Sequence, residues 1–172
     1  MPAWSGIHPL VVHFPIALLL VAPVLVLVGI ALKRQRAFLF AGLVVMALGT
    51  AGAWLAVESG EAAGELAENT PGVEAVLERH GEMAETTRTL FTVLTLVYAA
   101  LLFAPLALKR QPPRLAEIGA QGAFLAVYAA AAVYLAQTAH QGGMLVHQYG
   151  VHAVLGPAAP ALEAGRESAD DD

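Results

Sequence analysis

The chain has 172 residues, of which 58% are hydrophobic and only 13% are charged, and it contains no cysteine. Charged residues make up about a quarter of an ordinary soluble domain, so this composition is typical of a protein with lipid-facing surface. The lack of cysteine excludes disulfides, cysteine-ligated iron–sulfur clusters and thioether-linked haem, so any metal must be bound through histidine, methionine or carboxylate. The net charge of −5 gives no reason to expect a nucleic-acid partner.

The first apolar run covers residues 7–32 and ends at the basic residues of 33–36. A helix of roughly 20 apolar residues crosses a bilayer core of about 30 Å, so we predict a transmembrane helix over about 7–32. A cleaved signal peptide is the alternative. The run is, however, longer than the apolar core of a signal and has no basic segment before it. We therefore interpret it as a retained helix.

A second helix is predicted over about 37–68. Small residues that let a helix or a flat ligand approach closely recur in it, at Gly42, Gly49 and Gly52. A third helix is predicted over about 72–108, followed by the basic residues of 109–114. A fourth is predicted over about 115–141, where Gly142 and Gly143 supply a glycine cap. It carries its own row of small residues, at Gly119, Gly122, Ala126 and Ala130.

Glutamates recur at helical spacing on both sides of a turn-forming segment at 69–72. They are Glu58, Glu61, Glu65 and Glu68 before the turn, and Glu74, Glu78, Glu82 and Glu85 after it. Residues three and four apart share a helix face, and the composition Asn-Thr-Pro-Gly favours a turn. We therefore predict that the second and third helices extend beyond the membrane as a hairpin, with Leu66, Val73 and Leu77 on its inner face. The glutamate stripes are interpreted as solvated faces, with cation collection as the alternative.

Basic residues set the predicted orientation. Six of the nine Lys and Arg residues lie in the two short segments 33–36 and 109–114, which the positive-inside rule places in the cytoplasm. The sequence thus predicts an all-α, multi-pass protein of the cytoplasmic (inner) membrane, a four-transmembrane-helix bundle over residues 1–156 with both termini outside. The tail 157–172, acidic at its end, is predicted to be disordered.

All six histidines fall on the outer side of this topology or at its membrane edge: His8, His13, His80, His140, His147 and His152. His13 lies within the first apolar run, where an ionisable residue is costly and therefore often functional. Heights estimated from the helix rise of 1.5 Å per residue put His13 level with His140 and His8 nearer to His80. Two facing pairs are therefore predicted. Five residues correspond to about 140° of helix rotation, so His8 and His13 are not expected to bind one ion together.

Several segments together resemble a bacterial membrane family, the domain of unknown function numbered 2231. They are residues 7–18, His80, residues 139–146 and the pair Tyr149-Gly150. His147 departs from the pattern, because an aromatic residue is expected there. The family is similar in helix count to the two-haem b-type membrane cytochromes, and this resemblance implies a haem-binding function.

The leading functional hypothesis is a b-type cytochrome. In it, His8, His13, His80 and His140 hold one or two haem b groups for electron transfer with a membrane or extracytoplasmic redox partner. One alternative is a Zn or Cu site in which His13, His80 and His140 are joined by Glu61 or Glu82. Another is an accessory membrane subunit with structural histidines, no cofactor and an acidic docking surface. No nucleophile motif or phosphate-binding loop is present, so we do not expect an enzyme.

Overall fold

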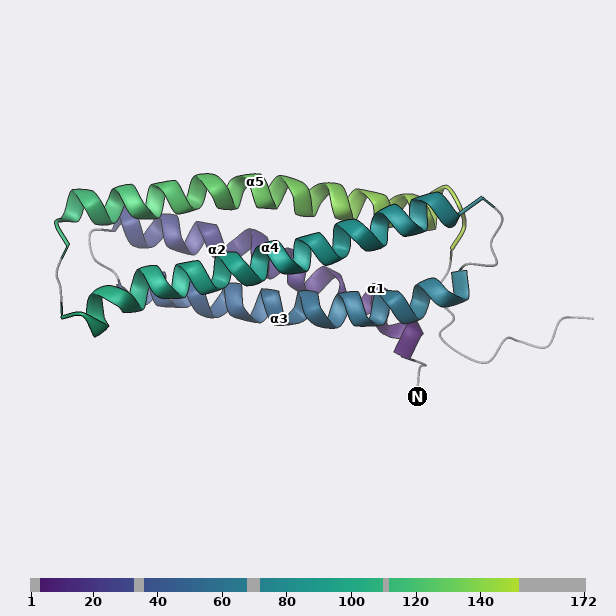
Figure 1. Cartoon of the computed structure of the whole chain (residues 1–172), viewed down its shortest axis with the longest axis horizontal. Helices are drawn as coiled ribbons and strands as arrows, with labels where there is room; N and C mark the ends of the chain where they lie inside the picture. The colour runs from purple at the N-terminus through teal and green to yellow at the C-terminus, as the bar shows by residue number, and fades with distance from the viewer. Residues whose placement is uncertain (1–3, 33–35, 68–71, 110–111, 152–172) are drawn as a thin grey trace, which may run out of the picture.

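The computed structural model describes residues 4–32, 36–67, 72–109 and 112–151. A short 3₁₀ helix, η1 (Trp4–Ile7), precedes the α-helices, which are α1 (His8–Val11), α2 (His13–Ala31), α3 (Arg36–Ala67), α4 (Glu74–Ala107) and α5 (Arg114–His147). The long helices lie alongside one another and give the molecule an elongated shape (Figure 1). Within the described part of the chain, four helices are long and apolar enough to cross a bilayer. The predicted class, an all-α four-helix membrane bundle, is therefore confirmed.

The helices form a closed ring of neighbours. α2 contacts α3, α3 contacts α4, α4 contacts α5, and α5 contacts α2, while η1 and α1 both contact α3. Consecutive long helices, α2 to α5, run in opposite directions, so each end of the bundle has its own set of helix termini (Figure 1). We call the end that carries α1, the start of α4 and the end of α5 the histidine end. The opposite end, with Arg36, Lys109 and Arg114, is the basic end.

Aromatic side chains fill the centre of the bundle. Phe124 stacks on Tyr98 with ring centroids 4.8 Å apart, and Phe91 meets Tyr128 edge-on at 5.3 Å. The Tyr128 hydroxyl donates a hydrogen bond of 2.7 Å to the carbonyl oxygen of Leu19. Tyr128 therefore links α5 to α2 across the apolar core, where unpaired polar groups are costly.

The outer faces of the helices are apolar as well. Leu20, Val24 and Leu27 on α2 are about half exposed, as are Val127 and Val133 on α5. Exposed apolar surface on this scale is unusual for a water-soluble monomer. It is the surface expected of helices surrounded by lipid.

The glycines of α3 serve helix packing against α2. A Cβ atom added to Gly49 would lie 2.8 Å from Leu19 Cγ, one added to Gly42 would lie 2.9 Å from Val26 Cγ2, and one added to Gly52 would meet Phe14 and Pro15 at 3.3 Å. The small residues of α3 were predicted to admit either a helix or a flat ligand. At these three glycines the space is occupied by side chains of α2. On α5, Gly119 and Gly122 are exposed, with no such neighbour within 4 Å.

α5 does not end where the sequence suggested. It continues through Gly142 and Gly143 to His147, so the glycine cap predicted there is wrong. The missing side chain of Gly142 instead leaves room for an imidazole, because a Cβ atom at this position would lie 3.0 Å from His80 Cε1. In the first apolar run, α1 and α2 adjoin at Val12, whose backbone dihedrals are also helical, so His8–Ala31 form one candidate membrane span.

α3 and α4 both continue past their apolar segments. α4 has 34 residues, or about 51 Å at 1.5 Å per residue, which exceeds a hydrocarbon core of about 30 Å. Val73 is buried and Leu77 is half-buried. The turn at 69–71 and the tail 157–172 lie outside the described residues, so the hairpin and the disordered tail stay predictions.

Candidate histidine site

His8 is the first residue of α1, and its ring packs against α3 at the histidine end. Its Nδ1 atom donates a hydrogen bond of 2.9 Å to the carbonyl oxygen of Ala56 and lies 3.2 Å from Ser59 Oγ. The ring rests directly on Gly60, where a Cβ atom would come within 2.9 Å of His8 Cε1. A carbonyl oxygen only accepts, so Nδ1 carries a proton, and in the neutral imidazole Nε2 keeps its lone pair.

His80 is held in the same manner between α4 and α5. Its Nδ1 atom donates a hydrogen bond of 3.1 Å to the carbonyl oxygen of Thr138, and its ring packs against the backbone of Gly142. Like His8, it is half-buried, and its Nε2 keeps a lone pair. Histidines that bind metals commonly donate the other ring N–H to a backbone carbonyl or carboxylate, which fixes the tautomer and the ring orientation.

Polar contacts between helices lie near both imidazoles. Arg88 of α4 forms an ion pair of 3.6 Å with Glu58 of α3, the neighbour of Ser59. Thr87, which precedes Arg88 in α4, has its Oγ1 atom 2.9 Å from Thr138 Oγ1 of α5. The backbone carbonyl of Thr138 accepts the hydrogen bond from His80. These contacts join α3 to α4 and α4 to α5 near the residues that hold the two imidazoles.

Buried hydroxyl groups lie among these interhelical contacts. Ser59, Thr87 and Thr138 are each less than 10% exposed. Their hydrogen bonds pair with backbone carbonyls and with one another, as buried polar groups normally do. Neither these residues nor the contacts of Gly60 and Gly142 were predicted from the sequence. The one signal available was the placement of small and hydroxyl residues beside the ends of the apolar runs.

His13 and His140 do not form the predicted facing pair. His13 is exposed, and its Nδ1 donates a hydrogen bond of 2.9 Å to the carbonyl oxygen of Pro9, one turn earlier in the chain. His140 is exposed on α5, as is His147. Both members of the predicted pair thus lie on the surface of the bundle rather than between its helices, while His152 lies outside the described residues.

The two glutamates predicted to join the histidines do not lie among them in the described part of the chain. Glu61 and Glu82, the proposed partners in a Zn or Cu site, are exposed. Among the residues described by the structure, no three His, Asp or Glu side chains converge as metal ligands. What the histidine end offers is a pair of half-buried imidazoles with matched tautomers.

Comparison with known proteins identifies a family but no function. No functionally curated protein and no solved structure is detectably similar to this chain. A family of predicted membrane proteins, DUF2231, matches residues 5–155, which is most of the chain and includes every histidine discussed above. Together with the four membrane-spanning helices, this match shows that the chain belongs to the DUF2231 family of membrane proteins.

Proposed function

We propose that this protein binds haem b at the histidine end of the bundle, with His8 and His80 as axial ligands, and takes part in one-electron transfer. The observation that carries the proposal is the shared geometry of the two imidazoles. Each donates Nδ1–H to a backbone carbonyl, at Ala56 and at Thr138, and each keeps a lone pair on Nε2. Two neutral imidazoles from different helices are a ligand set that haem iron accepts.

The number of ligands favours haem over a bare metal ion. Structural zinc sites use four protein ligands and catalytic ones three, and no third ligand converges on His8 and His80 within the described residues. Haem supplies four equatorial nitrogens itself and needs only axial ligands from the protein. Two histidines are therefore sufficient for haem, whereas zinc or copper would have to complete its shell with water.

The surroundings of the two imidazoles hold both rings in fixed orientations. Because glycine has no side chain, the His8 ring packs directly on the backbone of Gly60 and the His80 ring on that of Gly142. This close packing restricts the orientation of each ring. The hydroxyl groups of Ser59, Thr87 and Thr138 are buried and hydrogen-bonded within the protein, and they do not compete for the iron. Haem bound here would supply a reversible one-electron couple.

The orientation of the bundle decides which partner this couple meets. The basic end carries Arg36, Lys109 and Arg114, and the positive-inside rule assigns such an end to the cytoplasm. We infer that the protein lies in the cytoplasmic membrane with the histidine end outward. A redox partner would then be another membrane protein or an extracytoplasmic protein.

The ligand assignment is tested by histidine variants of the full-length protein, purified from cells supplied with a haem precursor. His8→Ala and His80→Ala should each abolish or strongly reduce bound haem, measured by the Soret absorption per protein. His140→Ala and His147→Ala are the matched controls, because both residues are exposed on α5; they should retain the wild-type absorption. Loss of haem in the His140 variant, with full retention in the His8 and His80 variants, would contradict this assignment.

A further inference from the structure

A cavity at the basic end opens between the ends of all four long helices. It has a volume of about 570 Å³ and is lined by residues of α2, α3, α4 and α5, which is within the range of small-molecule sites. Its walls are largely apolar and include Ile30, Leu39, Leu102 and Ile118. It lies at the opposite end of the molecule from the histidines.

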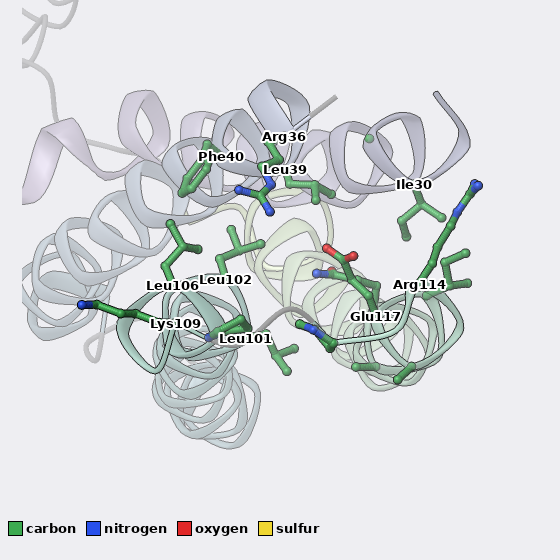
Figure 2. Close-up of a pocket in the computed structure, with 17 residues that line it drawn as sticks. Ile30, Arg36, Leu39, Phe40, Leu101, Leu102, Leu106, Lys109, Arg114 and Glu117 are labelled. Atoms are coloured by element: carbon green, nitrogen blue, oxygen red, sulfur yellow. The ribbon is translucent and has the colours of Figure 1, made fainter. Parts of the chain in front are cut away.

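The charged side chains that line this cavity are mostly positive. Arg36, Lys109 and Arg114 line it together with a single carboxylate, that of Glu117. Figure 2 shows the Arg36 guanidinium and the Glu117 carboxylate directed toward the enclosed space, while Lys109 and Arg114 extend outward at its rim. The excess of cations favours an anionic ligand. A guanidinium can donate two parallel hydrogen bonds to a phosphate.

A buried polar group lies further along the cavity wall. Gln121 lines the cavity and is only 3% exposed, and its Oε1 has no hydrogen-bond partner among the described residues. It follows Arg114 by seven residues, or about 10 Å along α5. An unpaired amide at this depth costs free energy, and a polar group of a ligand would relieve that cost. The two ends of an amide are interchangeable in shape, so this position suits either a donor or an acceptor.

We propose that the cavity binds an anionic glycerophospholipid from the adjoining membrane leaflet. The phosphate would lie at Arg36, the glycerol ester region would lie at the depth of Gln121, and the acyl chains would follow the apolar walls. Basic pockets between transmembrane helices are known to bind anionic lipid head groups. A lipid matches the polar rim, the polar group at intermediate depth and the apolar interior in one molecule.

The test is native mass spectrometry of the detergent-solubilised full chain equilibrated with phosphatidylglycerol, with phosphatidylcholine of the same acyl chains, or with glycerol 3-phosphate. The wild type should retain phosphatidylglycerol in preference to phosphatidylcholine. Arg36→Gln should lower phosphatidylglycerol retention about fivefold, as expected for the loss of one interfacial cation worth about 1 kcal/mol. Gln121→Leu, which keeps the cations, should also lower retention.

Arg79→Gln is the matched control. It removes the same charge from an exposed position on α4 at the histidine end, and retention should stay at the wild-type value. The proposal is overturned if both lipids are retained equally, or if the Arg79 and Arg36 variants lose phosphatidylglycerol equally. It is also overturned if glycerol 3-phosphate displaces the lipid at similar concentration, because the site would then belong to a soluble phosphate.

Discussion

The Nδ1 atom of His8 lies 2.9 Å from the carbonyl oxygen of Ala56, and this bond fixes which nitrogen of the ring remains free. His80 repeats the arrangement on another pair of helices, with Thr138 as its acceptor. In both cases the ring also lies against a helical glycine. The protein thus presents two imidazoles in the same tautomer, and this matched pair underlies the proposed haem site.

The contact between His80 and Gly142 leads to the first prediction. Gly142→Ala places a Cβ atom 3.0 Å from His80 Cε1, so His80 must shift, and the amount of bound haem should fall. Gly143→Ala should leave haem content unchanged, because no neighbouring atom lies within 4 Å of its added methyl group. Both changes favour the helix by up to about 1 kcal/mol, so helix propensity does not distinguish them. Haem absorption per protein measures the difference, and equal haem content in the two variants would argue against His80 as a ligand.

Two buried tyrosines provide a prediction about stability. Tyr128→Phe removes the hydrogen bond of 2.7 Å to Leu19 and should lower the free energy of unfolding by about 1 kcal/mol. Tyr98→Phe should be neutral or stabilising, because the buried Tyr98 hydroxyl has no partner among the described residues. Unfolding in mixed micelles with increasing dodecyl sulfate, followed by circular dichroism, compares them. A larger loss for Tyr98→Phe would contradict this description of the core.

The packing of α2 on α3 gives a third prediction. Gly49→Ala brings a Cβ atom to 2.8 Å from Leu19 Cγ and 3.2 Å from Leu18 Cβ. Overpacking of this kind typically costs 1–3 kcal/mol. Gly122→Ala, on an open face of α5, should not be destabilising. The same micelle unfolding assay applies, and equal stability of the two variants would mean that α2 and α3 are not closely packed at this position.

The orientation of the bundle is tested by fusions of a topology reporter. Fusions after Arg36 and after Arg114 should be scored as cytoplasmic, because these residues belong to the basic segments. A fusion after Glu68 should be scored as external. An external signal from the Arg114 fusion would reverse the proposed orientation and would place the histidine end in the cytoplasm.

The helices themselves were largely predictable from the sequence. Long apolar runs must form helices in a bilayer, because every backbone polar group has to be paired there, and the basic segments 33–36 and 109–114 limit them clearly. The continuation of α5 past Gly142 and Gly143 was not predictable in the same way. A glycine can end a helix, or it can make room for a neighbouring side chain. At Gly142 the neighbour is the His80 ring, which also bonds Thr138. His80 and Thr138 are 58 residues apart in the sequence, so local sequence could not reveal this contact.

The inward or outward direction of each histidine was only partly predictable. In a soluble helix, the polar face identifies the buried face. α2 and α5 are apolar on most sides where they meet lipid, so the rotation of His13 and His140 about their helix axes leaves no clear pattern in the sequence. His80 lies on an amphipathic extension whose glutamates mark the solvated side, and this pattern indicates that His80 faces the helices packed against α4.

The most direct test of the proposed function is the composition of the wild-type protein, purified from cells with ample haem and transition metals. Optical absorption, a haem assay and elemental analysis are applied to the same sample. We expect about one haem b per chain and the spectrum of low-spin iron with two imidazole ligands, which follows from the single matched pair His8 and His80. Protein that is folded and monodisperse but carries no haem would contradict the proposal. In that case, bound zinc or copper would favour a metal site, and the absence of both would favour an accessory subunit with structural histidines.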